Sequence, residues 1–236
     1  PFQSAAPLPM PYRPPLLGEH EAEIRTELAT AEPRTTTATT EISLPLQGVR
    51  VLDLSMFFAG PVAAQICADA GADVIKVESI QRIDGWRGAG TDPASELPSW
   101  ETSPYFNWVN RGKRDITLDL TDPRGADIIK HMVRDADIVI ENYTPRVMAK
   151  FGLSYDVLKA INPRLVMLSL SGFGNNVSWR DYVAFGMSTE QMSGVAHLTG
   201  YAGGDPLFTG TTGGDLFAGV MGVTTLLAAL EHRDQS

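Results

Sequence analysis

Cysteine is almost absent from this sequence: Cys67 is the one cysteine among 236 residues. A single thiol cannot form a disulfide within the chain, which favours a reducing compartment, and we therefore expect a cytoplasmic protein. Because Cys67 lies inside an apolar helical pattern, we interpret it as a small buried side chain and not as a nucleophile.

Positive charge is also scarce, with 19 Lys and Arg residues against 28 Asp and Glu, a formal net charge of −9. An acidic chain is a poor general ligand for nucleic acid or an anionic membrane, so we expect neither as a partner. We also expect no apolar run long enough to cross a bilayer. The 43 % of hydrophobic residues indicates a globular chain with one large domain or two small ones.

The glycines of a dinucleotide fingerprint are missing from the turn where they would be needed. Residues 48–78 read GVRVLDLSMFFAGPVAAQICADAGADVIKVE. Pro61 suits a first helical position and Gly71 suits the residue after a helix, so this stretch predicts a strand, a helix and a second strand. The turn before the helix holds only Gly60, whereas the NAD or FAD fingerprint needs three spaced glycines.

Short apolar runs alternate with helical patterns along the rest of the chain. The runs predicted as strands are Val49–Leu54, Val74–Val77, Ile116–Leu120, Ile138–Ile140 and Leu165–Leu170. Such alternation is typical of an α/β fold with a doubly wound parallel sheet. All of these runs except the one at 116–120 are predicted to be neighbours in the sheet, and a ligand is expected beyond their carboxyl ends.

The order and spacing of several motifs resemble the class III CoA-transferases, also called the CaiB/BaiF family. The motifs are L-x-G-V-R-V-L-D-L-S, A-G-P and G-A-D-V-I-K-V-E in residues 46–78, N-R-G-K-R at 110–114, D-I-V-I-E-N at 137–142 and G-G-D at 213–215. The family includes formyl-CoA and carnitine CoA-transferases and a branch of acyl-CoA racemases. The resemblance implies a Rossmann-like large domain, incomplete here, and an interlocked homodimer when the protein is full length.

Asp215 is the candidate catalytic residue. From the residues alone, an aspartate that follows two glycines and precedes an apolar helical pattern is typical of a helix N-cap. The resemblance places the family's catalytic aspartate on the same position. It implies that the carboxylate attacks an acyl-CoA thioester and that CoA passes, through an aspartyl anhydride and an aspartyl thioester, to a small carboxylic acid. No metal is expected.

Carried over residue by residue, the resemblance also implies contacts with coenzyme A. The implied contacts are Phe57, Phe58 and Ala59 after the first strand, Arg111 and Lys113 near the nucleotide, Leu118 beside the adenine, and Asn142, Tyr143 and Lys150 along the pantetheine and phosphates. Phe58 stands where some members have a polar residue, which suggests an apolar wall. Thr121 stands where some have a lysine, which weakens one phosphate contact.

Three alternatives to CoA transfer remain open. The racemase branch needs a histidine in a Gly-His-Asp context, where this chain has Gly186-Met187-Ser188, and methionine cannot move a proton. We interpret His197 as a core residue, so racemisation or isomerisation is disfavoured. A lyase acting after CoA transfer is a narrower variant. In a non-catalytic CoA-binding module, Asp215 would be only a helix cap.

The first 43 residues carry a second resemblance. PPLLGEHEAEIRTEL, at 14–28, is similar to the C-terminal signature of the same family. We therefore predict that residues 1–29 are the tail of a preceding copy, that 30–43 are a linker and that 44–236 are the large-domain portion. The alternative is a disordered leader. Residues 1–40 are expected to make few contacts with the first half of the sheet.

Overall fold

The structure is a computed structural model that describes residues 13–30, 44–210 and 212–235. Its centre is a parallel sheet of β1 (Arg50–Asp53), β2 (Asp73–Glu78), β3 (Arg114–Thr117), β4 (Ile138–Glu141) and β5 (Val166–Ser169). The strand order is β3-β2-β1-β4-β5, so the direction of winding reverses between β1 and β4. The predicted doubly wound α/β fold and the predicted neighbouring strands are confirmed.

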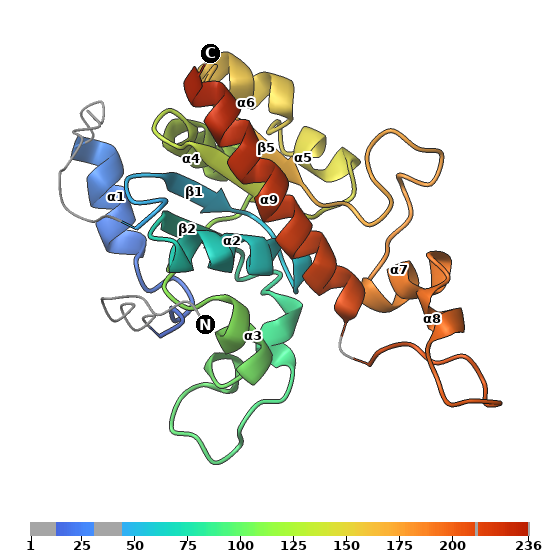
Figure 1. The fold of residues 1–236 in the computed structure, drawn as a ribbon. Helices are drawn as coiled ribbons and strands as arrows, with labels where there is room; N and C mark the ends of the chain where they lie inside the picture. The colour runs from blue at the N-terminus through green and yellow to red at the C-terminus, as the bar shows by residue number, and fades with distance from the viewer. Residues whose placement is uncertain (1–12, 31–43, 211, 236) are drawn as a thin grey trace.

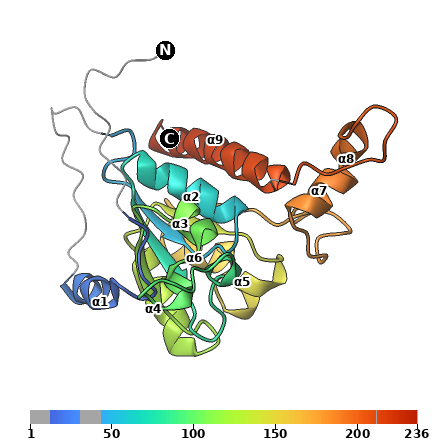
Figure 2. The same cartoon turned by 90° about the horizontal axis from the view of Figure 1, so that it is seen from below.

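Helices cover both faces of the sheet (Figures 1 and 2). One face packs against α2 (Ala59–Asp69) and α9 (Gly213–Gln235), and the other against α1 (Glu21–Thr30), α4 (Pro123–Val133), α5 (Arg146–Lys150) and α6 (Tyr155–Ile161). Successive strand residues face opposite layers: Val51 packs towards α2 and α9, whereas Leu52 packs towards α1 and α4. This accounts for strands that are apolar on both faces.

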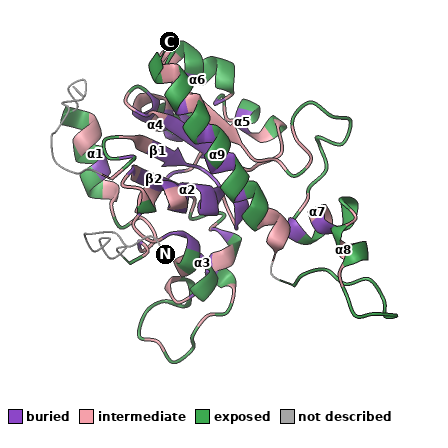
Figure 3. Cartoon of the chain, in the orientation of Figure 1, coloured by how far each residue is buried: buried purple, intermediate pink, exposed green. Residues whose placement is uncertain are grey.

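The remaining elements lie in the connections. They are the short 3₁₀ turns η1 (Gly85–Gly88) and η2 (Ser99–Glu101) and the helices α3 (Pro104–Val109), α7 (Gly186–Met192) and α8 (Val195–Leu198). α7 and α8 are separated at Gly194, whose φ of 82° is left-handed. The segment with α7 and α8 projects from the sheet as an arm that is largely exposed (Figure 3).

Ionic groups are buried beneath the carboxyl ends of β1 and β2. The Lys113 ammonium donates to Asp53 Oδ2 at 2.8 Å, to Asn110 Oδ1 at 2.8 Å and to the Pro61 carbonyl at 3.0 Å. The Lys76 ammonium donates to the Ser55 carbonyl at 2.9 Å and pairs with the Asp84 carboxylate at 3.2 Å. These bonds tie the end of β1 to the first turn of α2.

The prediction that residues 1–40 make few contacts with the first half of the sheet is wrong for residues 13–30. Ile24 is 1 % exposed and belongs to the main core, and the Arg114 guanidinium of β3 binds Glu27 and Asp73. The Gly18 N–H donates to Asp115 Oδ1 at 2.6 Å. The predicted linker lies, apart from Thr30, outside the described residues, and the origin of the segment in a preceding copy stays a prediction.

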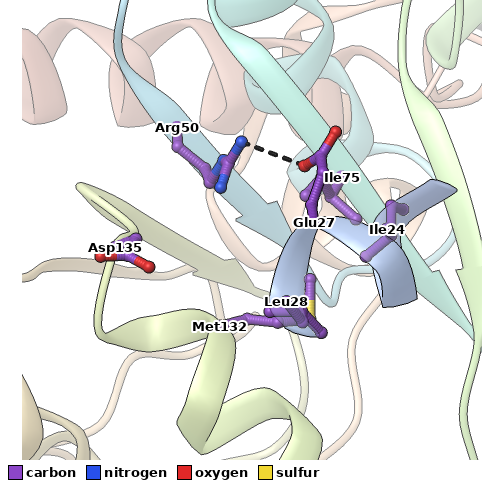
Figure 4. Close-up of a pocket in the computed structure, with 7 residues that line it drawn as sticks. All are labelled: Ile24, Glu27, Leu28, Arg50, Ile75, Met132 and Asp135. Atoms are coloured by element: carbon purple, nitrogen blue, oxygen red, sulfur yellow. Dashed lines mark hydrogen bonds and ion pairs between the residues drawn. The ribbon is translucent and has the colours of Figure 1, made fainter. Parts of the chain in front are cut away.

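Figure 4 shows the seam between α1 and the sheet. Ile24 and Leu28 of α1 face Met132 of α4, and Glu27 reaches across to the Arg50 guanidinium at 3.3 Å. The cavity that remains between them is about 10 Å³. Because so little space is left, α1 is packed as an integral part of this layer.

Among the described residues, α9 is the one helix that is long and apolar enough to cross a membrane by length and composition. The expectation that no apolar run has this length is therefore wrong. Core helices of other proteins pass the same test. One side of α9 packs closely on α2, since a Cβ at Gly219 would lie 2.7 Å from the Ala59 carbonyl, and its other side exposes Phe217 and Met221.

Candidate active site

A cavity of about 330 Å³ opens beyond the carboxyl ends of β1, β4 and β5. It is bordered by Met56, Phe57, Phe58 and Ala59 after β1, Asn142, Tyr143 and Thr144 after β4, Leu170, Ser171 and Gly172 after β5, the arm residues Tyr182, Ala184, Phe185 and Thr189, and Gly214, Asp215 and Ala218 of α9. This is the switch point of the sheet, where open α/β folds bind their ligands.

Asp215 lies in the first turn of α9, at the border of this cavity. Its Oδ2 accepts a hydrogen bond from the Gly186 N–H at 3.1 Å, so the carboxylate is oriented by α7. α9 begins at Gly213, and Asp215 is therefore the third helical residue and not its N-cap. Burial raises the pKa of the Asp215 carboxyl, the Gly186 N–H opposes this, and the charge of Glu190 adds to the rise.

Two glycines allow α7 and α9 to approach each other. A Cβ at Gly186 would lie 2.8 Å from Asp215 Oδ2, and a Cβ at Gly214 would lie 2.2 Å from Thr189 Oγ1. Either side chain would push the catalytic candidate out of place. Gly186 and Gly214 thus allow the close packing of α7 against the start of α9.

The turn after β1 contains a strained residue. Phe57 has a φ of 64°, a left-handed conformation that costs a bulky residue about 1–3 kcal/mol. Its N–H is held by both carboxylate oxygens of Asp84, at 3.1 and 3.2 Å. The ring packs edge-on against Trp86 and Phe185, and only glycine fits at position 85 beneath it. The strained backbone places the aromatic side chain of Phe57 at the border of the cavity.

Phe58 and Ala59 stand where the turn enters α2. Phe58 is 2 % exposed and packs on Val62 and Trp108, and it also borders the cavity, so this apolar residue belongs to the core and to the cavity wall at once. Phe57 and Phe185 extend the apolar wall. α2 begins at Ala59 without a side-chain cap.

Asn142 holds the turn after β1 in place. Its Oδ1 accepts from the Met56 N–H at 2.9 Å and its Nδ2 donates to the Met56 carbonyl at 2.7 Å. Both polar atoms of the amide are thus bonded to backbone. Asn142 borders the cavity as predicted, but its amide positions the neighbouring strand end.

A second cavity of about 260 Å³ lies beyond β2 and β3. Leu118 and Thr121 line it, together with Lys76, Glu78 and Asp119. Four residues border both cavities and so mark the passage between them: Met56, Arg82, Tyr143 and Val147. Arg82 is the one Lys or Arg among the described residues that borders both. Sequence reasoning missed it, although a cation four residues after a buried strand was the available signal.

Three predicted cations line neither cavity. Arg111 donates to the Trp108 carbonyl and pairs with Asp69 at 3.5 Å near the end of α2. Lys113 is 3 % exposed and bonded to three oxygens, so its ammonium is not available to a phosphate. Lys150 is exposed at the end of α5. Arg82, by contrast, borders both cavities.

Comparison with known proteins decides the family. A family model described as CoA-transferase family III matches residues 46–236. The chain belongs to this family. It is 40 % identical over 194 residues to a succinate–glutarate CoA-transferase of Agrobacterium fabrum, a match that covers 81 % of this chain and 48 % of that protein. A mouse succinyl-CoA:glutarate CoA-transferase is 36 % identical over 191 residues, 80 % of this chain and 42 % of that protein.

Solved structures agree with this assignment. A CaiB/BaiF family protein from Brucella suis superposes with a TM-score of 0.77 at 36 % identity, over 82 % of this chain and 50 % of that one. The protein Rv3272 of Mycobacterium tuberculosis gives a TM-score of 0.74 at 31 % identity, over 82 % and 52 %. The chain therefore spans about half the length of the family III relatives that it matches.

The position of His197 bears on the racemase alternative within the family. The predicted core location is wrong, since His197 is exposed on α8. Met187 of α7 stands at the position where racemases need a histidine, and the preceding Gly186 donates its N–H to Asp215. Among the described residues that border the cavity there is no histidine to act as a second base.

Proposed function

We propose that this chain carries the covalent-catalysis half of a CoA-transferase that moves CoA from an acyl-CoA to a dicarboxylic acid, with Asp215 as nucleophile. The single observation that carries the proposal is the placement of Asp215: a half-buried carboxylate, oriented by the Gly186 N–H, borders the cavity at the switch point of the sheet. Relatives named for succinate, glutarate and malate support the acid class.

The chemistry follows from a carboxylate nucleophile in a cavity with apolar walls. An Asp215 oxygen attacks the donor thioester carbon, the C–S bond breaks, and an aspartyl acyl anhydride and CoA thiolate form. The thiolate attacks the aspartyl carbonyl and releases the donor acid. The acceptor carboxylate then attacks the carbonyl of the resulting aspartyl thioester, so that the C–S bond breaks and an anhydride of Asp215 with the acceptor acid and CoA thiolate form. The thiolate finally attacks the acceptor acyl carbon of this anhydride, which gives the acceptor acyl-CoA and frees the Asp215 carboxylate.

The raised pKa of the Asp215 carboxyl suits its role as the nucleophile. A desolvated carboxylate is a stronger nucleophile than one bathed in water, because fewer hydrogen bonds must be broken when it attacks. The aromatic side chains of Phe57 and Phe185 exclude water from the same cavity, and this protects an anhydride from hydrolysis.

The two cavities match the two ends of coenzyme A. With the nucleotide in the second cavity beside Leu118 and the thioester in the first beside Asp215, the linking part of the ligand passes Met56, Arg82 and Tyr143. A guanidinium at that passage suits a diphosphate, to which it donates in parallel. Arg82 thus takes the part in our proposal that the sequence suggested for Arg111 and Lys113.

We also propose a homodimer in the full-length protein and a reducing, cytoplasmic location. The exposed apolar stripe of α9, with Phe217, Val220 and Met221, supports a partner surface, because large apolar faces on a helix are normally covered. The single buried Cys67 supports the location.

The experiment is to incubate the chain with an acyl-CoA carrying a labelled acyl group and to search for the label on Asp215 by peptide mass spectrometry. Trapping the anhydride with hydroxylamine should leave a hydroxamate at this residue. Asp215→Asn is the matched control and should remain unlabelled. Calorimetric titration with CoA runs beside it: CoA binding without any adduct would identify a binding module, and absence of both would refute the proposal for this chain.

A further inference from the structure

Glu190 of α7 lies next to the turn that carries Asp215, and the mechanism above gives it no part. Its side chain is 5 % exposed. Its Oε2 accepts from the Thr209 N–H at 2.8 Å, and its Oε1 accepts from the Thr209 hydroxyl at 2.7 Å and from the Gly214 N–H at 3.4 Å. One carboxylate therefore binds Thr209 and, at Gly214, the turn 212–215 that carries Asp215.

The turn that Glu190 binds is strained. Thr212 has a φ of 51°, which is unusual for a β-branched residue. Its carbonyl accepts from the Asp215 N–H at 3.0 Å, so the strained residue begins the helical turn that holds the carboxylate. Such a conformation persists only where the surrounding contacts hold it, and Glu190 provides contacts on both sides of it.

The same short helix also orients the Asp215 side chain. The Gly186 N–H donates to Asp215, the Thr189 hydroxyl donates to the Gly186 carbonyl at 2.8 Å, and Glu190 follows directly in the sequence. α7 thus binds the Asp215 carboxylate at one end and the backbone before Asp215 at the other. Movement of either relative to α7 would rotate the carboxylate within the cavity.

We propose that Glu190 is a positioning residue for Asp215: its carboxylate, bonded to Thr209 and Gly214, holds the strained turn so that the nucleophile points at the thioester. Only the statement that Asp215 points at a thioester rests on the proposed function. The charge of Glu190 has a second consequence, because it opposes ionisation of the neighbouring carboxyl and raises the pKa of Asp215. Bonds from the backbone and hydroxyl of Thr209 lower the pKa of Glu190, which keeps it charged.

The other charged or titratable groups around Asp215 are few. Arg82 borders the same cavity from the loop after β2, Tyr143 from the end of β4 and Tyr182 from the arm. In the described part of the chain, no hydrogen bond or ion pair joins any of these three to Asp215, and burial raises the pKa of Tyr143 to about 12, so that it stays neutral. Glu190 is therefore the group whose removal should change the titration of Asp215.

The test compares three variants of the present chain. Glu190→Gln removes the charge and one acceptor, Thr209→Val removes the hydroxyl donor but keeps the charge, and Glu96→Gln removes the same charge from an exposed loop. Carbon-13 NMR titration of the Asp215 carboxyl and hydrogen exchange of the 208–216 peptide are measured on each. Neither measurement requires the chain to react with an acyl-CoA.

We expect Glu190→Gln to lower the pH at which Asp215 titrates and to speed exchange at 213 and 214 by about tenfold or more. Thr209→Val should speed exchange without moving the titration, and Glu96→Gln should change neither. In a chain that forms the acyl adduct, Glu190→Gln should slow adduct formation at saturating acyl-CoA by about 10- to 100-fold, because the nucleophile is misplaced.

Unchanged titration and unchanged exchange in Glu190→Gln would overturn the inference. If that variant does not fold, Thr209→Val still decides, since exchange at wild-type rates there would show that the turn does not depend on these bonds. If both readouts move as expected but the wild-type chain forms no adduct, Glu190 positions Asp215 and the proposed function fails by itself.

Discussion

The two sides of the candidate site are built in different ways. The floor, after β1 and β2, rests on buried ion pairs in which Lys113 binds Asp53 and Lys76 binds Asp84, all within the core of the domain. The wall that carries Asp215 is the first turn of α9, which a few hydrogen bonds from α7 hold in place. α7 belongs to the exposed arm, where Leu198 and Tyr201 are 86 % and 85 % exposed. Changes in the floor should therefore cost stability, whereas changes in the wall should cost geometry and rate.

The largest effect should come from the wall. Asp215→Asn is expected to lower CoA transfer in the complete enzyme by roughly 10³-fold or more, about 4 kcal/mol in the barrier, because an amide is a poor nucleophile. Its stability should change by about 1 kcal/mol or less, since one hydrogen bond to Gly186 is altered. A thermal melt and a CoA-exchange assay on one preparation measure both. Retention of a tenth of the activity would remove Asp215 from the mechanism.

The floor should show the opposite behaviour. Lys113→Met leaves the buried Asp53 carboxylate without its nearest cation and should lower the free energy of unfolding by about 3–5 kcal/mol. Urea denaturation measures this. Lys130→Met, which removes an exposed pair with Asp127, is the matched control and should change stability by about 0.5 kcal/mol or less. Equal effects of the two variants would show that the floor is not specially sensitive.

The α1 layer extends the comparison to the edge of the sheet. Ile24→Ala should lower the free energy of unfolding by about 2–4 kcal/mol, because Ile24 fills the core between α1 and α4. Thr26→Ala, on the exposed side of α1, should have little effect. If both variants unfold at the same urea concentration as the wild type, α1 is not part of the cooperative unit.

Arg82 tests the passage between floor and wall. Arg82→Met should weaken CoA binding by about tenfold, roughly 1.4 kcal/mol, through loss of a charged partner for the diphosphate. Binding of a pantetheine thioester, which lacks the diphosphate, should be unchanged, and Arg111→Met should leave both affinities intact because Arg111 borders neither cavity. Calorimetry gives both constants. Equal losses for the two ligands would exclude the diphosphate contact.

The smallest effect concerns pH. Burial and the neighbouring Glu78 carboxylate raise the pKa of Asp115 well above its usual range. The folded state then binds a proton that the unfolded state releases above about pH 4, so stability falls as the pH rises towards the raised pKa. Asp115→Asn should flatten this fall, so that the stability of the variant changes less than that of the wild type between about pH 5 and about pH 8. Urea melts at the two pH values test this, and an unchanged slope would count against it.

Much of the architecture was predictable because its causes are local. Apolar runs of strand length and the Ala59-Gly60-Pro61 corner each act within a few residues, and β1, β2, β4 and β5 lie where they were predicted. The strand predicted over 116–120 is shifted towards the N-terminus, since β3 spans Arg114–Thr117. The position of Asp215 beside a cavity came from resemblance. Its place as the third residue of α9, and not as the N-cap, depended on where the chain before it turns.

Several predictions failed where the answer depended on distant partners. The sequence shows Lys113 in a basic cluster, and only the meeting of β1, α2 and the 110–113 loop buries its ammonium against Asp53 and Pro61. His197 lies in an apolar helical pattern, yet α8 is on an exposed arm. Glu190 carries no motif, so it could not be singled out before the fold brought it to the site, and for Arg82 the one sequence signal was its place four residues after a buried strand.

The sequence by itself determined the parallel α/β sheet and the membership in CoA-transferase family III, because periodicity and motif order are properties of the chain alone. Tertiary structure decided which charges are buried, that residues 13–30 complete the core, and that α7 orients Asp215. The physical reason is that burial, electrostatics and hydrogen bonding depend on groups far apart in sequence: Gly186 and Asp215 are 29 residues apart and 3.1 Å from N to Oδ2.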